Sequence, residues 1–269
     1  YIIIMKLGVI GCGKMGSALV KGAISKGAIE SGEVLVFDTF EESAEKLSKE
    51  IGVKIANNSN DLVKNSDAVL LCVKPQDIIS LTECLDKDRN GILFISIAAG
   101  VKIQDLEKSL LDKDRVIRVM PNTPAMIGKG ASAQSRGSNA TESDIQFVKN
   151  LLNAVGIALE VPEKQLDAVT GLSGSGPAYI YTVIEAMADG GVLVGLPKDQ
   201  ALMLAAQTVS GAAEMIINSK EHPATLRDQV SSPGGTTIAG LAAIESGKLR
   251  STLIEAVKAA TERSKELGN

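Results

Sequence analysis

Short apolar runs alternate with longer amphipathic stretches along the first part of the chain, up to about Val161. Apolar runs of this length are typical of β-strands, and continuous apolar strands separated by amphipathic helices indicate a parallel sheet covered on both faces. The chain is expected to open with a right-handed β-α-β unit. The predicted strands are Leu7–Ile10, Val34–Phe37, Val53–Ala56, Ala68–Val73, Ile92–Ile97, Val116–Met120, Ala131–Ser135 and Ile157–Val161.

The pattern changes after Pro162, where the strand signal ends and helical sequence rich in Ala and Gly begins. Lys198–Asn218 is apolar on nearly every side, which is typical of a helix that is buried all round. A helical region this apolar is expected to bury its excess surface against a second copy of the chain. We therefore predict an α/β domain at residues 1–162, followed by an all-α dimerisation domain at residues 163–269.

Composition and charge exclude several classes of protein. The 269 residues are 45% hydrophobic but only 3% aromatic, so aliphatic side chains must build the core. The net charge of −4 provides no basic excess for a nucleic-acid partner, and the longest apolar run, Gly91–Val101, is too short to span a membrane. Cys12, Cys72 and Cys84 lack the spacing of a disulfide framework or a metal site, which predicts no metal and a cytoplasmic location. The four residues before Met5, a candidate natural start, lack the features of a signal peptide.

The first predicted strand runs directly into a glycine-rich turn, Gly11-Cys12-Gly13-Lys14-Met15-Gly16. In a G-x-G-x-x-G motif between a strand and a helix, the first glycine permits a tight turn and the second lets the backbone approach a pyrophosphate. The third allows close packing of helix on strand. The motif predicts a Rossmann-type domain that binds a dinucleotide, with a purely structural glycine turn as the alternative.

Asp38 ends the next predicted strand, about 20 positions after the glycine motif. A carboxylate at this place accepts hydrogen bonds from the adenosine ribose and repels a 2′-phosphate. Because no Arg follows in Thr39–Glu42, the local sequence favours NADH over NADPH. The alternative is a solvated carboxylate that caps the helix expected at Glu41–Lys49.

Three later strands end in loops of small residues and proline. These loops are Val73-Lys74-Pro75, Ile97-Ala98-Ala99-Gly100 and Met120-Pro121-Asn122-Thr123-Pro124. Ligands of open α/β sheets bind outside the carboxyl ends of the strands, where these loops are expected. We interpret the loops as a close-fitting wall for a ribose and a nicotinamide, although each loop alone is equally consistent with ordinary turn chemistry.

The helical half carries another loop of small residues, Ser231-Ser232-Pro233-Gly234-Gly235-Thr236-Thr237, at the expected start of a helix. Free backbone amides and the helix dipole suit a carboxylate there, although such a loop commonly serves only as a helix cap. The single histidine, His222, precedes a proline at another expected helix start, which indicates a structural or capping role.

The helical half lacks the base that alcohol oxidation requires. The 3-hydroxyacid dehydrogenases share this two-domain plan and place a Lys on the first helix of the second domain, but no Lys occurs from Leu172 to Gly195. Reduction of an imine needs less, because the C=N carbon is already electrophilic once the nitrogen has taken up one proton, and it then requires only positioning beside the hydride donor. The pattern therefore favours an imine as the substrate.

Two stretches of the second half, Asp167–Tyr179 and Leu226–Leu241, strongly resemble the signatures of pyrroline-5-carboxylate reductases. The three strand-end loops also resemble that family, and together these motifs cover the whole chain in order. The resemblance implies hydride transfer from NADPH or NADH to the ring imine of 1-pyrroline-5-carboxylate, which yields L-proline in the last step of proline biosynthesis. It also implies a homodimer formed through the helical domains, often assembled into a ring of dimers.

The resemblance further implies roles for individual residues. The substrate carboxylate is expected to bind backbone amides of the loop that contains Ser232, Gly234, Gly235, Thr236 and Thr237. The Thr237 hydroxyl is expected to hydrogen-bond the ring nitrogen as the catalytic group. The residues expected at the cofactor are Ile10, Gly11, Cys12, Gly13, Lys14, Met15, Asp38, Ser59 within the Asn57–Asn60 turn, Val73, Lys74, Pro75, Ile97, Ala98, Ala99, Glu163 and Gln229.

Asp38 departs from the family pattern, in which many members carry Ser or another neutral residue, and this departure puts a preference for NADPH in doubt. Two other functions remain open. One is a related reductase that acts on another imine or on a keto acid. The other is a catalytically silent regulatory protein that binds a dinucleotide.

Overall fold

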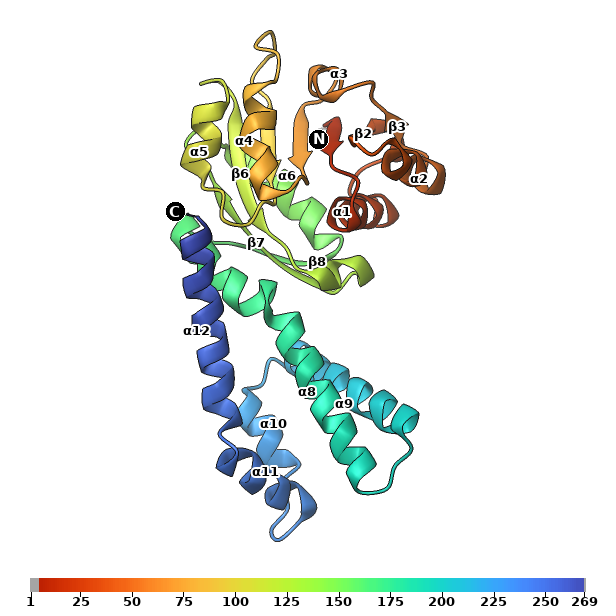
Figure 1. Ribbon diagram of the computed structural model, residues 1–269, viewed down its shortest axis with the longest axis vertical. Coiled ribbons are helices and arrows are strands. Elements are labelled where there is room, and N and C mark those ends of the chain that lie inside the picture. The colour runs from red at the N-terminus through yellow and green to blue at the C-terminus, as the bar shows by residue number, and fades with distance from the viewer. Residues whose placement is uncertain (1–4, 269) are drawn as a thin grey trace. The chain divides into compact units, whose positions relative to one another are not determined.

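In the computed structural model, which describes residues 5–268, the chain forms two compact units (Figure 1). The first unit comprises the chain up to Ser175 together with the residues from Ala259 onward, and the second comprises Gly176–Lys258. The domain boundary placed at Pro162 follows the end of the strand-rich sequence, and the last strand does end just before it, at Glu160. The four residues before Met5, and with them its interpretation as the natural start, lie outside the described part.

Within the described residues, eight strands form one sheet in the order β3-β2-β1-β4-β5-β6-β7-β8. Their bounds are β1 Leu7–Ile10, β2 Val34–Phe37, β3 Lys54–Ile55, β4 Ala68–Leu71, β5 Leu93–Ser96, β6 Arg115–Met120, β7 Gly130–Arg136 and β8 Gly156–Glu160. The predicted parallel arrangement is confirmed for β1 to β6, whereas β7 is antiparallel to β6 and β8 is parallel to β7. The strand direction reverses because residues 121–129 are too few for the crossover that parallel neighbours require.

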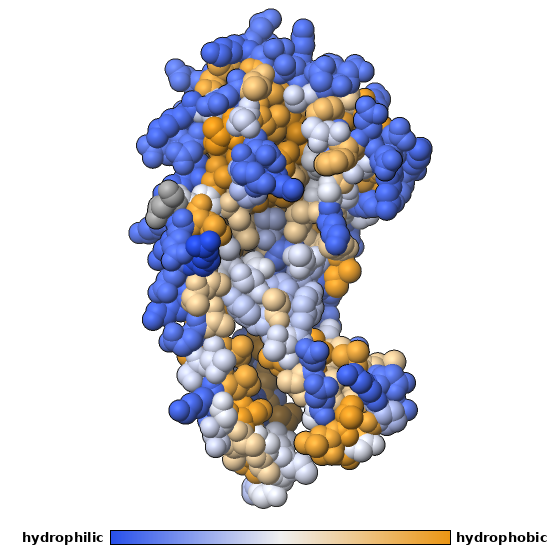
Figure 2. Space-filling view, viewed as in Figure 1, coloured by the Kyte–Doolittle hydropathy of each residue, from blue (hydrophilic) through white to orange (hydrophobic). Residues whose placement is uncertain are grey.

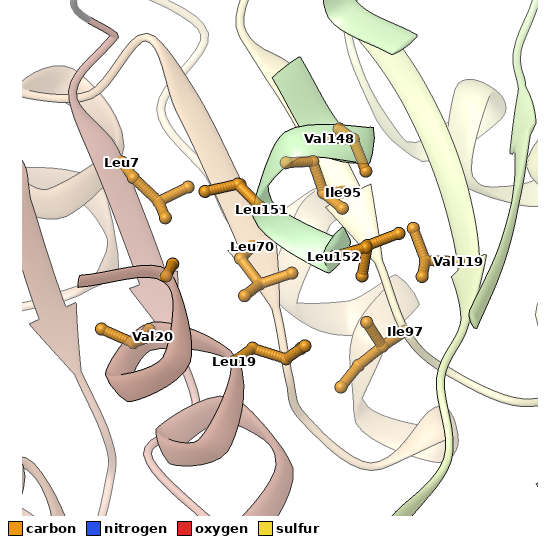
Figure 3. Close-up of a pocket in the computed structure, with 11 residues that line it drawn as sticks. Leu7, Leu19, Val20, Leu70, Ile95, Ile97, Val119, Val148, Leu151 and Leu152 are labelled. Carbon is orange, nitrogen blue, oxygen red and sulfur yellow. The ribbon is translucent and has the colours of Figure 1, made fainter. Parts of the chain in front are cut away.

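Helices cover both faces of the sheet, and each face has its own apolar core. One core lies beneath α1 (Lys14–Ser25), α2 (Glu41–Ile51) and α6 (Glu142–Asn153), and the other beneath α3 (Ser59–Lys64), α4 (Pro75–Glu83) and α5 (Ile103–Ser109). A cavity of about 20 Å³ between α1, α6 and the sheet is lined only by apolar side chains (Figure 3). This void belongs to the core, because it offers a ligand neither space nor polar partners.

After β8 the chain packs back onto the first unit through a short helical segment. The segment consists of η3 (Glu163–Gln165), α7 (Leu166–Val169) and a π-helical turn, η4 (Thr170–Gly174). Leu166 is fully buried, and the Ser264 hydroxyl near the end of the chain donates a hydrogen bond to Asp167 Oδ1 at 2.7 Å. These contacts explain why residues 163–175 and the last residues belong to the first unit.

The second unit is helical, as predicted. It contains α8 (Gly176–Leu193), α9 (Lys198–Ser219), α10 (Pro223–Gln229), α11 (Thr236–Ser246) and the first part of α12 (Leu249–Leu267). Its buried cluster is small and joins Ala188 of α8 to Ala201 and Ala205 of α9. None of the helices in the described chain is both long and apolar enough to cross a bilayer.

The expectation that α9 is buried all round is wrong for the single chain. Its apolar side chains at 202–204 and 215–217 are exposed, because α8 is the only described element that packs closely against it, and α8 covers one face. Leu193 and Val194, at the end of α8, are exposed as well. Figure 2 shows such apolar surface over the helices of this unit, on the face in view.

Candidate active site

The glycine-rich turn adopts the tight geometry that the motif predicts. Gly11 has a φ of +102°, and a Cβ atom there would lie 2.6 Å from Cys72 O. A Cβ atom on Gly16 would lie 2.2 Å from Gly11 O, so α1 could not pack this closely with a larger residue. A Cβ atom on Gly13 would instead meet no heavy atom within 4 Å, so the turn is crowded toward the sheet and open on its other side. This open side is suited to close approach by a phosphate group.

The start of α1 supplies the electrostatic part of an anion site. Gly13 is the N-cap residue, and no side chain of the described chain caps the helix there. The first amides of a helix lack partners within the helix and carry the positive end of its dipole. Lys14, the first residue of α1, is exposed and adds a positive charge at the same end.

Asp38 joins the glycine-rich turn to the end of β2. Its Oδ2 accepts a hydrogen bond from Cys12 N at 2.6 Å, and its Oδ1 accepts one from Phe40 N at 2.9 Å. The alternative interpretation, a cap for α2, is wrong, because the N-cap residue is Phe40 and no side chain caps that helix. Burial raises the pKa of the Cys12 thiol to about 12, and the negative charge of Asp38 contributes to the increase.

The predicted strand-end loops lie side by side at the carboxyl ends of the parallel strands. The loops at Val73–Pro75 and Ile97–Gly100 follow β4 and β5, which are parallel to β1 and lie next to one another in the sheet. Lys74 and Ala99 are exposed, whereas Ala98 is buried. These loops and the glycine-rich turn therefore form one continuous rim of the first unit.

The Asn57–Asn60 turn follows β3 at the same ends of the strands, and most of its polar side chains form hydrogen bonds with other residues of the chain. Asn57 Nδ2 donates to Asp61 Oδ2 at 2.9 Å, and Asn58 Oδ1 caps α3 by accepting from Asp61 N at 2.9 Å. Asn60 Oδ1 accepts from Asp86 N. Ser59 is half-buried at the first position of α3.

The loop after β6 holds neighbouring backbone in place through Asn122. This side chain is almost fully buried, donates from Nδ2 to Ser173 O at 3.0 Å, and accepts at Oδ1 from Ala131 N at 2.9 Å. The loop was predicted to form part of the ligand wall, but the internal role of Asn122 was missed. The motif Met120-Pro121-Asn122-Thr123-Pro124 singled out this residue without indicating its partners.

Glu163 holds two elements together in a similar way. Its Oε1 accepts a hydrogen bond from Ile103 N, at the start of α5, at 2.7 Å and one from Arg118 Nη1 at 3.0 Å. The Arg118 side chain is buried within the sheet. Sequence reasoning missed Arg118, because a charged residue inside an apolar strand gives no indication of its partner.

The loop before α11 forms a tight turn with its backbone exposed. Gly235 N donates to Ser232 O at 3.1 Å, and Gly234 has a φ of +65°, which favours glycine. Gly235 is the N-cap residue of α11 and no side chain of the described chain caps this helix, so the amides at Thr236 and Thr237 open the helix without a side-chain partner. The Thr237 side chain is half-buried at the second helical position.

Two other predicted residues of the second unit have partners within it. His222 Nδ1 accepts from Ala224 N at 3.2 Å and caps α10, which confirms the predicted capping role. Gln229 Nε2 donates to Glu221 Oε2 at 3.0 Å on the surface. In the described residues, no group of three or more His, Cys, Asp or Glu side chains is arranged to hold a metal ion.

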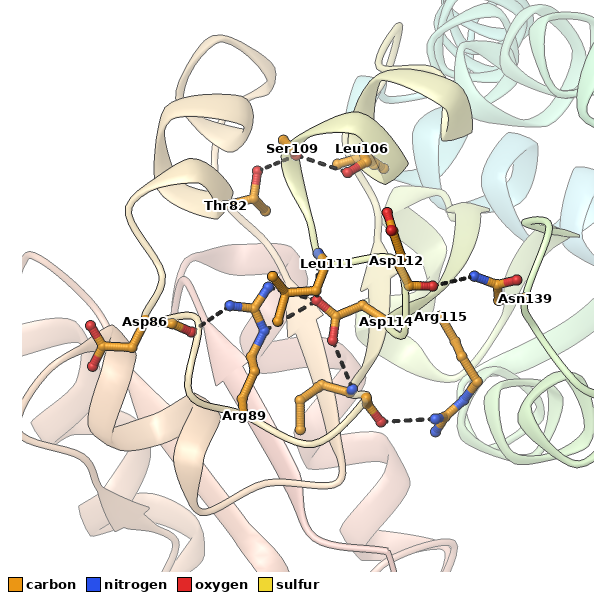
Figure 4. A network of polar contacts seen from close by, with 12 residues as sticks. Thr82, Asp86, Arg89, Leu106, Ser109, Leu111, Asp112, Asp114, Arg115 and Asn139 are labelled. Carbon is orange, nitrogen blue, oxygen red and sulfur yellow. Dashed lines mark hydrogen bonds and ion pairs between the residues drawn. The ribbon is translucent and has the colours of Figure 1, made fainter.

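A further polar cluster lies at the amino ends of β5 and β6, opposite the rim that carries the loops (Figure 4). The guanidinium of Arg89 donates to Asp114 Oδ2 from Nε at 3.1 Å and from Nη2 at 2.6 Å. Asp114 also accepts from the backbone amides of Ile92 and Leu111. Both charged side chains are buried, so the pair holds this end of the sheet together.

A cavity of about 270 Å³ adjoins this cluster. Both α4 and α5 end beside it, at Glu83 and Ser109, and the carbonyl ends of helices attract positive charge. Lys87 and Lys108 line this cavity, and Lys108 Nζ lies 3.8 Å from Asp105 Oδ1 on its own helix. We interpret this region as structural.

The fold and the rim define the class of protein: a Rossmann-type, dinucleotide-binding protein with a helical second unit. Comparisons with known proteins identify the family. The family model "Pyrroline-5-carboxylate reductase dimerisation" matches residues 163–267, and the model "NADP oxidoreductase coenzyme F420-dependent" matches residues 6–100.

Relatives match over almost their whole length. The chain is 46% identical to pyrroline-5-carboxylate reductases from Arabidopsis thaliana (97% of this chain, 95% of the relative) and Methanosarcina acetivorans (98% of each). The structure superimposes on that of the Coxiella burnetii pyrroline-5-carboxylate reductase with a TM-score of 0.94, at 34% identity and 99% coverage of both chains. The Plasmodium falciparum pyrroline carboxylate reductase, solved with NADP bound, gives a TM-score of 0.85 at 32% identity and 98% coverage of both. The chain belongs to the pyrroline-5-carboxylate reductase family.

Proposed function

We propose that the protein reduces the ring C=N bond of 1-pyrroline-5-carboxylate to give L-proline, the last step of proline biosynthesis, with NADPH or NADH as the hydride donor. Membership of the family over nearly the full length of the chain carries this proposal. The Plasmodium falciparum relative with NADP bound supports the choice of cofactor.

The rim of the first unit fits such a cofactor. A bound nicotinamide dinucleotide supplies a hydride, and the open side of Gly13 together with the uncapped start of α1 gives a diphosphate both space and amide donors. Asp38 provides acceptors beside a ribose. The residues that we propose to hold the cofactor are Ile10, Gly11, Cys12, Gly13, Lys14, Met15, Asp38, Ser59, Val73, Lys74, Pro75, Ile97, Ala98 and Ala99.

Glu163 and Gln229 were assigned to the cofactor by resemblance, and their contacts favour an indirect role. Glu163 Oε1 already accepts hydrogen bonds from Ile103 N and Arg118, and Ile103 begins the helix that follows the Ile97–Gly100 loop. We propose that Glu163 holds this loop in position. Gln229 is similarly paired with Glu221 on the surface.

The loop before α11 suits a small carboxylate. We propose that the backbone amides of Ser232, Gly234, Gly235, Thr236 and Thr237 hold the substrate carboxylate, because a helix start without a side-chain cap is a favourable anion site. The Thr237 hydroxyl would hydrogen-bond the ring nitrogen, which gains a proton as the adjacent carbon gains the hydride. A threonine hydroxyl is a weak acid, so its role is to orient the nitrogen and relay a proton.

The exposed apolar helices of the second unit support a homodimer. Leu193, Met203 and Ile217 are among the apolar side chains that a single chain leaves in solvent, and a second copy would cover such a surface. The match to a dimerisation family model over 163–267 agrees with this arrangement. A ring of dimers and a cytoplasmic location are the further proposals, the latter because the three cysteines are free thiols. Sedimentation of an active, stable monomer at micromolar concentration would contradict the dimer.

Steady-state kinetics with 1-pyrroline-5-carboxylate and each of NADH and NADPH tests the activity. The proposal expects oxidation of at least one cofactor with formation of L-proline. Oxidation of neither cofactor would refute it. In that case turnover of another cyclic imine or of a keto acid would indicate a related reductase, and binding of NADH without any turnover would indicate a silent regulatory protein.

A further inference from the structure

Phe40 exposes its ring beside the proposed cofactor site. Phe40 is the only exposed aromatic residue among those described in the first unit, with 76% of its surface accessible to solvent, whereas Phe94 is fully buried and Phe37 and Phe147 are partly buried. Single exposed apolar residues are common on protein surfaces, so exposure alone does not assign a function. The position of this ring is what distinguishes it.

Two hydrogen bonds tie Phe40 to the glycine-rich turn. Asp38 Oδ1 accepts from Phe40 N at 2.9 Å, and the other oxygen of the same carboxylate accepts from Cys12 N at 2.6 Å. The backbone that carries the ring is therefore fixed relative to the turn proposed to hold the diphosphate. The ring lies two residues beyond the carboxylate proposed to face the adenosine ribose.

Local folding does not explain a phenylalanine at this position. Phe40 is the N-cap residue of α2, where Ser, Thr, Asp or Asn would satisfy an amide of the first turn, and its side chain makes no capping hydrogen bond. The ring also gains little from burial. The residue thus makes no capping interaction and leaves an aromatic face in solvent, where a flat ligand bound beside the glycine-rich turn can reach it.

We propose that the Phe40 ring is the surface on which the adenine base of the dinucleotide stacks. The proposal rests on the proposed function, because it requires that the cofactor bind at the rim. Adenine is joined to the ribose that Asp38 is proposed to contact, and a flat aromatic base pairs favourably with an exposed aromatic ring. Stacking of this kind contributes to affinity for the adenosine half of the cofactor and leaves the nicotinamide half unaffected.

A single tryptophan tests the contact directly, because the chain contains no Trp. In Phe40→Trp, the emission of the introduced indole should be quenched or shifted by ADP-ribose and by AMP, and left unchanged by nicotinamide mononucleotide. Unchanged emission at concentrations of ADP-ribose that saturate the protein would overturn the proposal. A change in emission with protein concentration in the absence of nucleotide would place the ring in a contact between copies and would also overturn it.

Binding constants provide the second measurement. By calorimetry, Phe40→Ala should raise the Kd for ADP-ribose roughly 5- to 100-fold, the range for loss of one stacked base, while Phe40→Tyr stays close to wild type. Leu159→Ala is the matched control, because Leu159 is 61% exposed on β8, at the far edge of the same sheet. The Kd of this variant for ADP-ribose should equal that of the wild type. Equal affinity of Phe40→Ala and wild type for ADP-ribose would refute the stacking role. Failure of the wild-type protein to bind NADH, NADPH or ADP-ribose would instead refute the cofactor site itself, and this inference with it.

Discussion

Replacing Asp38 by serine tests whether one negative charge sets the preference between NADH and NADPH. The two cofactors differ only by the 2′-phosphate on the adenosine ribose, and the Asp38 carboxylate is fixed beside the glycine-rich turn by hydrogen bonds from Cys12 N and Phe40 N. A unit charge about 5 Å from a phosphate charge, at an effective dielectric constant of about 40 to 80, costs about 1–2 kcal/mol. Removal of the carboxylate should therefore raise the NADPH-to-NADH ratio of kcat/KM roughly 5- to 30-fold.

The same substitution also removes two backbone hydrogen bonds, which complicates any single measurement. Loss of a hydrogen bond to a charged group costs about 1.5–3 kcal/mol, and a disturbed turn should weaken binding of both cofactors. That effect cancels in the ratio, because both cofactors use the same turn. Asp38→Asn is the matched control: it removes the charge and keeps a carbonyl oxygen able to accept from one of the two amides.

The assay is steady-state kinetics of wild type, Asp38→Ser and Asp38→Asn with each cofactor at a fixed ionic strength, because salt screens a partly exposed charge. Both variants should shift the ratio in the same direction, with Asp38→Asn less impaired overall. An unchanged ratio in both variants would show that the Asp38 charge does not face the 2′ position. A shift in Asp38→Ser alone would contradict the electrostatic explanation, because Asp38→Asn lacks the negative charge as well.

Two further predictions concern buried groups of the first unit. Asp114→Ala should lower the free energy of unfolding in urea by about 3–5 kcal/mol, because it leaves the charge of the Arg89 guanidinium, only 4% exposed, without its carboxylate partner. A loss below about 1 kcal/mol would mean that the pair does not hold the sheet end. Exposed Cys84 should react with iodoacetamide well before Cys12 at pH 8, since a pKa of about 12 leaves about one Cys12 thiol in ten thousand ionised. The rate of Cys12 alkylation should rise as the pH is raised well above 8. Equal labelling of the two cysteines by peptide mass spectrometry at pH 8 would contradict the buried, protonated state of Cys12.

The sequence correctly predicted those structural elements that a short stretch of residues specifies by itself. Apolar runs correctly predicted the strands, and the glycine spacing predicted a turn in which Gly11 and Gly16 leave no room for a side chain. The reversal of β7 was missed because the apolar pattern of a strand is the same in either direction. The short connection at 121–129 did carry the information, since a parallel neighbour needs a longer crossover.

Side-chain partners far apart in sequence were beyond prediction. Asn122 and Ser173, or Arg118 and Glu163, meet only because the chain after β8 packs back onto the first unit. Sequence patterns mark such residues as unusual but do not identify what they contact. The apolar face of α9 illustrates a related limit: the sequence indicated that this surface must be covered, and the single chain does not cover it.

The Thr237→Ala variant tests whether the Thr237 hydroxyl acts in catalysis or only stabilises the helix. The helix-cap alternative requires a stability cost of about 1 kcal/mol, but the N-cap of α11 is Gly235, and Thr237 lies at the second helical position without a capping bond. Alanine is also the better helix former, so the melting temperature should be unchanged or slightly raised. Loss of the hydroxyl should lower kcat roughly 10- to 1000-fold, whereas KM should change less, since backbone amides are proposed to hold the carboxylate.

Two variants make the Thr237 result decisive. Thr237→Ser keeps a hydroxyl and should recover most of the lost kcat, whereas Thr252→Ala removes an exposed helical threonine hydroxyl elsewhere in the second unit and should leave kcat unchanged. A destabilised Thr237→Ala protein with undiminished kcat would make the residue structural, and the group that orients the ring nitrogen would then have to lie elsewhere. A fall in kcat without loss of stability and with little change in KM, restored by serine, assigns the hydroxyl to the reacting atoms, because folding and carboxylate binding are both intact in that protein.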